Sequence, residues 1–237
     1  EVALWSSGLD AFAGLYNQTQ ANTANEYVLF GTGSSPFITH KQRGVYELLP
    51  KPMRNMSKLI QVPITVQKVS MPLADHQLLR SRGFVFLMMG AVCALLEGQQ
   101  QLAVYENGIG AINLPFRASE VGLDHARSVH PLSLIYVGEF ISDVLGSPFA
   151  FHNPFLFYTK AQMCQALSNK QDLDAAYETV SCDRRRRDPK ALQCGRCSSC
   201  ILRRQAFAAL GIPDRTPYVY SDNWSLGDIG PNHPGNH

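Results

Sequence analysis

The stretch VALWSSGLD, residues 2–10, decides how the rest of the chain is interpreted. Residues 2–5 form a short apolar run that is typical of a buried strand. Small residues follow at 6–8, and apolar residues then recur at helical spacing from 9 to 16. A strand, a tight turn and a helix in this order direct backbone N–H groups and the positive end of the helix dipole at an anion. The stretch therefore indicates a phosphate-binding turn, with Asp10 placed to hold Mg²⁺ against phosphate oxygens. The alternative is an ordinary strand–helix turn, since many such turns contain Ser and Gly simply to turn the chain.

The remaining chain alternates strand-like and helical segments. Strands are predicted at residues 26–32, 60–69 and 101–106, and helices at 42–49, 81–97, 131–145 and 199–210. A further helix is expected to begin after Thr159, which opens a capping-box pattern with Gln162. This alternation predicts an α/β fold with a parallel sheet. Such sheets bind ligands at the carboxyl ends of their strands, which here are residues 6–10, 31–34 and 106–109.

The composition narrows the class of protein. With 237 residues and 45% hydrophobic content, the chain can form one large domain, or one domain with an appendage. A net charge of +2 does not indicate a nucleic-acid-binding surface. No apolar run approaches the ~20 residues that cross a bilayer, and no secretory signal is present, so a cytoplasmic location is expected. Because the chain starts at Glu1 within an apolar run, upstream residues are expected to be missing.

Four cysteines are spaced as Cys182-x11-Cys194-x2-Cys197-x2-Cys200. A two-residue gap lets two sulfurs face one point, and Gly195 supplies the backbone freedom that such a turn needs. The alternative, a set of buried or disulfide-linked thiols, is disfavoured because these short gaps would strain the pairs. The spacing predicts a structural Zn²⁺ site, in which four sulfurs leave no position for a catalytic water.

Two segments resemble one protein family. Residues 2–10 resemble the pyrophosphatase loop of the PP-loop ATP enzymes, whose usual form is Ser-Gly-Gly-x-Asp-Ser/Thr. Residues 194–207, CGRCSSCILRRQAF, with GIPD at 211–214, are similar to the zinc segment of 7-cyano-7-deazaguanine synthase, the QueC family. Residues 82–86 and Pro154 with Thr159-Lys160 also resemble that family. The resemblance covers most of the chain in order.

The resemblance implies a PP-loop (adenine nucleotide α-hydrolase-like) fold, with an ATP-binding domain at 1–178 and a zinc-binding segment and tail at 179–237. It also implies an ATP-dependent C–N ligase. The family activates the carboxylate of 7-carboxy-7-deazaguanine as an acyl-adenylate with release of pyrophosphate. Ammonia then gives the amide, and a second activation gives the nitrile. ATP, Mg²⁺ and a structural zinc are the expected cofactors, and a homodimer is a possible assembly.

The resemblance and the strand ends together imply residue roles, and the roles of Lys160, Arg82, Leu29 and Phe30 come from the resemblance. Asp10 and Lys160 are the expected catalytic residues, although a lysine beside a helix cap is also a common surface residue. The expected ATP-binding residues are Ser6, Ser7, Gly8, Leu9, Asp10 and Arg82, with main-chain contacts to adenine from Leu29 and Phe30. The expected substrate-binding residues, by their position at a strand end, are Glu106, Asn107 and Gly108.

Two positions depart from the family pattern. Ser7 stands where the family has Gly, so the backbone approaches phosphate less closely. Ala11 stands where the family has Ser or Thr, and the lost hydroxyl costs ~1–3 kcal/mol in a buried site. The family's substrate segment is replaced by Glu106-Asn107-Gly108-Ile109-Gly110. The chain therefore resembles a divergent member of the family.

Divergence leaves several functions open. An acyl-adenylate can be captured by any amine, so the acceptor is ammonia or a protein amine, as in relatives from bacterial anti-phage defence clusters. The alternative is a non-catalytic nucleotide-binding or scaffold protein, which the residues at positions 7 and 11 favour. A weaker alternative is thiolation of transfer RNA. That reaction needs catalytic cysteines near the sheet edge, where Cys93 and Cys164 are poorly placed.

Overall fold

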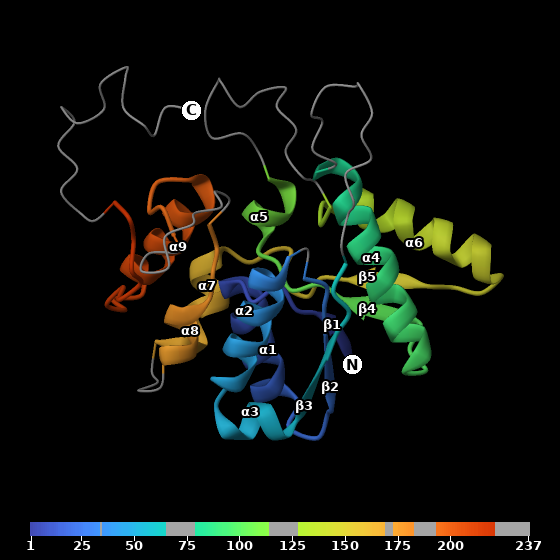
Figure 1. Cartoon of the computed structure of the whole chain (residues 1–237), viewed down its shortest axis with the longest axis horizontal. Coiled ribbons are helices and arrows are strands. Elements are labelled where there is room, and N and C mark those ends of the chain that lie inside the picture. The colour runs from blue at the N-terminus through green and yellow to red at the C-terminus, as the bar shows by residue number, and fades with distance from the viewer. Residues whose placement is uncertain (34, 65–78, 114–127, 169–172, 183–192, 221–237) are drawn as a thin grey trace, which may run out of the picture.

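The computed structural model describes residues 1–33, 35–64, 79–113, 128–168, 173–182 and 193–220 (Figure 1). Its centre is a five-stranded sheet in the order β3-β2-β1-β4-β5, and every strand pair is parallel. The strands are β1 (Val2–Leu4), β2 (Tyr27–Gly31), β3 (Ser57–Gln61), β4 (Gln101–Ala103) and β5 (Ala150–His152). The predicted α/β fold with a parallel sheet is confirmed.

Helices cover both faces of the sheet (Figure 1). One face carries α4 (Leu79–Leu96) and α6 (Pro131–Leu145), whose buried side chains pack on β1, β2 and β4. The other face is covered by a second set of helices. These are α1 (Leu9–Ala21), α2 (Pro36–Glu47), α3 (Lys51–Asn55), α7 (Lys160–Cys164), α8 (Asp174–Glu178) and α9 (Ser198–Ala209), with a 3-10 turn at Gln165–Leu167; α5 (Gly108–Ile112) lies at the carboxyl edge of the sheet.

Several predicted boundaries were wrong. The third strand begins at Ser57 rather than at residue 60 and ends before Pro63, because proline cannot donate to the ladder; residues 65–69 lie outside the described ranges. The helix predicted at 42–49 begins at Pro36, where Ser35 accepts a hydrogen bond from the Ile38 N–H. The strand β5 was missed, since three residues carry no periodicity.

Other local signals were confirmed. The Thr159 hydroxyl accepts a bond from the Gln162 N–H, and the Gln162 side chain accepts one from the Thr159 N–H, which completes the capping box. Helix α6 begins at Pro131 and ends before Gly146, whose φ is 65°. Within the described ranges, every helix is too short or too polar to cross a bilayer.

The C-terminal part of the chain shares the core of the sheet. Phe207 of α9 and Ile212 belong to the same buried cluster as Leu9 and Phe12 of α1. Helix α9 also packs on α7, the helix that begins with Lys160. The zinc-type segment is therefore attached to the side of the fold that carries the predicted phosphate turn.

Candidate functional site

The strand order places a ligand crevice between β1 and β4. The chain passes from β1 to β2 on one side, whereas β4 pairs with β1 on the other side. At such a reversal the loops at the carboxyl ends separate, and ligands bind there in open α/β sheets. Residues that follow β1 and β4 therefore line this crevice.

A cluster of charged and polar side chains occupies the crevice. Asp10, in the first turn of α1, forms an ion pair with the ammonium of Lys160 at the start of α7. The Asn107 side-chain amide donates to Asp10 Oδ1 and to Glu106 Oε1, each at 3.0 Å. We call Asp10, Glu106, Asn107 and Lys160 the carboxylate cluster. Lys160 is only 5% exposed, so it is not a surface lysine.

The electrostatics of the carboxylate cluster are dominated by burial. Burial and the neighbouring Asp10 carboxylate raise the pKa of Glu106 from 4.5 to about 8. Burial alone lowers the pKa of Lys160, but Asp10 and Glu106 outweigh this effect and raise it above its ordinary value. At neutral pH Glu106 is therefore largely protonated, and it lies beside the ion pair of Asp10 and Lys160. Strongly shifted groups in a crevice are typical of functional sites.

The backbone around Glu106 is held by residues that sequence reasoning missed. The Asn153 side chain accepts from the Glu106 N–H at 3.5 Å and donates to the Glu106 carbonyl at 2.9 Å. Asn153 directly follows β5. The sequence signal that could have identified it is an Asn before Pro154 at a strand end. Asn107 also caps α5, because its side chain accepts from the Gly110 N–H. These bonds fix the Glu106 carboxyl at the crevice.

The position of Gly108 depends on the absence of a side chain. Its N–H donates to the Tyr158 carbonyl at 2.9 Å, and a Cβ there would lie 2.2 Å from the Leu156 carbonyl oxygen. This contact closes one side of a pocket of about 250 Å³ beside the carboxylate cluster, with Ile109, Ile112 and residues 156–159 as its other walls. Most of this lining is apolar, as is common in small-molecule pockets.

The predicted phosphate turn has an unusual backbone. Ser7 has a φ of 63°, in the left-handed region where the family pattern places glycine. Gly8 is the N-cap of α1 and supplies no side chain to its first N–H groups, while its own N–H donates to Ser6 Oγ at 3.1 Å. A helix N-terminus without a side-chain cap suits an anion. Ala11 is buried in the core, and as an alanine it offers no hydroxyl to a phosphate.

The remaining ATP-related predictions concern Leu29, Phe30 and Arg82. The side chains of Leu29 and Phe30 are buried in the two cores on opposite faces of the sheet. The Phe30 carbonyl accepts from the Trp5 N–H at 2.8 Å. Contacts to adenine from these two residues stay a prediction. Arg82 lies in α4, and its side chain is outside the described part of the structure.

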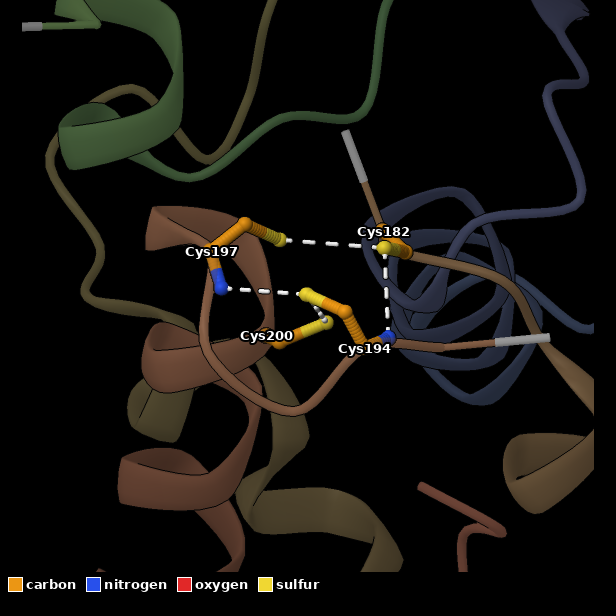
Figure 2. A group of neighbouring side chains, drawn as sticks. All are labelled: Cys182, Cys194, Cys197 and Cys200. Carbon is orange, nitrogen blue, oxygen red and sulfur yellow. Dashed lines mark hydrogen bonds between the residues drawn. The ribbon is translucent and has the colours of Figure 1, made fainter. Parts of the chain in front are cut away.

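The four predicted cysteines converge (Figure 2). Their sulfurs lie within 4.8 Å of one another, with 4.0 Å between Cys194 and Cys200 and 3.8 Å between Cys182 and Cys197. A tetrahedral zinc with ~2.3 Å bonds separates its sulfurs by roughly 3.8 Å, so the set fits this metal. We call these four residues the cysteine cluster. Gly195 has a φ of 82°, as the predicted turn requires.

Backbone N–H groups also support the cysteine cluster. The Cys194 sulfur accepts from the N–H groups of Arg196 and Cys197, at 3.3 and 3.2 Å. Hydrogen bonds from Cys182, Cys197 and Cys200 lower the pKa of Cys194 far below its ordinary value, which favours a thiolate. The donor set therefore suits a metal ion such as zinc.

Comparison with known proteins agrees with this arrangement. Residues 56–211 match the family model for Queuosine biosynthesis protein QueC. The chain belongs to the QueC family. Three similar relatives are 7-cyano-7-deazaguanine synthases: from Magnetococcus marinus (32% identity over 58% of this chain and 56% of the relative), Pseudomonas paraeruginosa (43%, over 32% of each chain) and Desulfatibacillum aliphaticivorans (42%, over 29% and 28%). The chain thus spans less than two thirds of each QueC relative.

Proposed function

We propose that the chain uses ATP to activate a carboxylate of the 7-carboxy-7-deazaguanine type and passes the acyl group to an amine, as an ATP-dependent C–N ligase. The observation that carries this proposal is the carboxylate cluster beside an uncapped helix N-terminus, in a QueC family member. The relatives are named as synthases of 7-cyano-7-deazaguanine, which supports the same class of substrate.

In the proposed first step, a carboxylate oxygen of the substrate attacks the α-phosphorus of ATP. The bond from that phosphorus to the bridging oxygen breaks, and pyrophosphate leaves with its electron pair. We assign the N–H groups of residues 9 and 10, at the uncapped start of α1, to the leaving phosphates. We assign Lys160 to neutralise their charge. Asp10 and Glu106 suit Mg²⁺, which would spread the same charge, and Asp10 retains unused lone pairs for this.

In the proposed second step, the amine nitrogen attacks the acyl carbon and AMP leaves. We assign Glu106 to accept the released proton in its carboxylate form, which a pKa of about 8 leaves as the minor form at neutral pH and the major form above pH 8. Gly108 borders the 250 Å³ pocket, Asn107 directly precedes it, and we assign this pocket to the deazapurine ring. A second activation of the amide would give the nitrile.

Turnover of ATP tests the proposal. We expect release of AMP and pyrophosphate that depends on 7-carboxy-7-deazaguanine. Nucleotide binding without any turnover would favour the alternative of a non-catalytic or scaffold protein, for which Ser7 and Ala11 are the supporting residues. The thiolation alternative is disfavoured, since burial raises the pKa of the Cys164 thiol to about 12.

The acceptor amine is a separate proposal. A protein amine, in place of ammonia, would give a product that stops at the amide and would suit an antiviral defence system. Phe157, which is 94% exposed three positions before Lys160, offers an apolar contact at the rim for a larger acceptor. Mass spectrometry of partner proteins after incubation with ATP and the carboxylate measures acyl transfer to a protein amine. A free nitrile product without any protein mass gain would exclude it.

A homodimer is proposed from the outer face of α6. An outward face of a surface helix is ordinarily polar, yet large apolar residues here are 44–69% exposed within the described ranges: Phe84 of α4 and Leu132, Ile135, Tyr136, Phe140 and Val144 of α6. The Phe84 and Phe140 rings lie 6.2 Å apart, so the two helices form one apolar patch. Light scattering should show a dimer that Tyr136→Glu dissociates, whereas Leu48→Glu on another surface leaves it intact.

A further inference from the structure

The stretch from Thr179 to Cys182 passes directly beside the phosphate turn. The Val180 N–H donates a hydrogen bond of 3.1 Å to the Ser7 carbonyl. The Val180 carbonyl oxygen also lies close to the turn, because a Cβ on Gly8 would be 3.6 Å from it, in van der Waals contact. The backbone after α8 therefore lies against the turn at two successive positions.

The conformation of Ser7 gives this contact its importance. A residue with a side chain costs about 1–2 kcal/mol in the left-handed region, and Ser7 has a φ of 63°. Ser7 is also 2% exposed, so water does not stabilise its backbone. A tertiary hydrogen bond to its carbonyl is a direct means of holding the turn in this conformation. The same peptide orients the N–H groups that follow at the start of α1.

Both residues that flank Val180 are anchored by the C-terminal segment. Arg203 of α9 is fully buried, and its guanidinium donates to the Thr179 hydroxyl at 2.7 Å, the Thr179 carbonyl at 3.2 Å and the Ala176 carbonyl at 2.7 Å. Gln193 donates to the Thr179 carbonyl and accepts from the Ser181 N–H, both at 3.1 Å. Cys182 of the cysteine cluster follows directly. Val180 is thus held from behind by residues near the metal site.

These contacts also have an explanation that concerns folding alone. In that explanation, Arg203 only provides hydrogen-bond donors for the buried carbonyls at the end of α8. That explanation does not require Val180 to contact the phosphate turn. It also does not account for a serine in the left-handed region at that contact. The link between the two segments predicts an effect on nucleotide binding, whereas helix capping alone predicts an effect only on stability.

We propose that Val180 is a positioning residue for the nucleotide. Its N–H holds Ser7 in the left-handed conformation, which directs the N–H groups of the turn at the pyrophosphate of ATP, and Arg203 holds Val180 in place. The C-terminal segment thereby braces the ATP site in addition to the fold. The inference rests on the proposed use of ATP at this turn.

Val180→Pro tests the inference because it removes the N–H donor, although it also replaces the side chain and fixes φ. Thr179 has a ψ of 145°, which is compatible with a following proline. The matched control is Val180→Ala, which keeps the N–H. We expect Val180→Pro to weaken ATP binding by about five- to tenfold, the worth of one hydrogen bond, and to speed amide exchange at residues 6–11 without nucleotide. Val180→Ala should bind ATP within about twofold of the parent, and both should keep full zinc content.

Each result decides one proposal. If the parent binds ATP and Val180→Pro binds it equally well, with unchanged amide exchange, the brace is excluded and the ATP site stands. If the parent binds no ATP, the proposed function fails; faster amide exchange in the apo variant would still support the contact. If Val180→Pro does not fold, Arg203→Lys replaces it. That change keeps the positive charge but loses the several N–H donors of the guanidinium. The proposed positioning role predicts a raised KM for ATP with an unchanged KM for the carboxylate.

Discussion

The carboxylate cluster and the cysteine cluster are assembled in opposite ways. The four cysteines lie between positions 182 and 200, and three of them lie within one turn and the helix that follows it. Asp10 and Lys160 are 150 positions apart, and Asn107 enters from a third segment. The cysteine cluster closes on itself, with all four sulfurs turned toward one point (Figure 2). The carboxylate cluster keeps buried charged groups at the carboxyl edge of the sheet, where open α/β sheets bind ligands.

The difference separates stability from chemistry. Four thiolates around a metal leave no position for a substrate, so this site can stabilise the fold without reacting. Buried carboxylates and an ammonium cost desolvation energy and contribute little net stability. They are retained where shifted pKa values are useful. We therefore expect changes in the two clusters to have different consequences.

The largest effect is expected at the carboxylate cluster. Asp10→Asn removes the carboxylate that pairs with Lys160 and is proposed to face the phosphates, and it should lower ATP turnover by roughly 100- to 1,000-fold. Zinc content should be unchanged, since Asp10 does not contact a sulfur. Asp143→Asn, on the exposed face of α6, is the control. Turnover that survives Asp10→Asn would contradict the assignment of this site.

The reverse result is expected for the cysteine cluster. Cys200→Ser should abolish stoichiometric zinc binding and destabilise the fold by several kcal/mol, because metal binding and folding are coupled. Metal analysis and thermal unfolding measure the two effects. Cys93→Ser changes a buried thiol in the core on the other face of the sheet and should keep the zinc. Equal zinc content in the two variants would show that the cysteine cluster is not a metal site.

The pH dependence of stability sharpens the comparison. The pKa of Glu106 is about 8 in the folded chain and 4.5 as its ordinary value. The folded state therefore binds more protons between these values, and stability should fall as pH rises from about 5 to 8. Glu106→Gln, which stays neutral, should remove this loss, on the order of a few kcal/mol. Urea unfolding of both proteins at several pH values tests the sign, and parallel pH profiles would contradict it.

The smallest effects are expected at the two left-handed turns, one beside each cluster. Ser7→Gly relieves backbone strain and should change stability by less than about 1 kcal/mol, in the stabilising direction. Gly195→Ala introduces strain at a φ of 82°, with a Cβ only 2.8 Å from the Tyr220 carbonyl oxygen, and should destabilise by about 1–2 kcal/mol or more. Urea unfolding compares them. Effects of the same sign would contradict the assigned conformations.

Local sequence patterns were sufficient for much of this protein. The cysteine spacing, the turn at Gly195, the capping box at Thr159 and the strand–turn–helix of residues 2–10 each depend on neighbours within a few positions. The physical reason is that tight turns, caps and short ligand gaps are decided by residue type and local backbone geometry. The alternation of strands and helices predicted the parallel sheet in the same way.

The contacts that join distant segments were decided only by the tertiary structure. Nothing near Lys160 in the sequence shows that it is buried against Asp10, and nothing near Arg203 shows that it binds Thr179. The short strand β5 and the role of Asn153 depend on a neighbouring strand. Burial and pairing depend on which segments the sheet order brings together, and this order is a property of the whole chain. The sequence by itself determined the phosphate turn and the cysteine motif. Only the fold decided that the segment leading to the first cysteine lies against the phosphate turn.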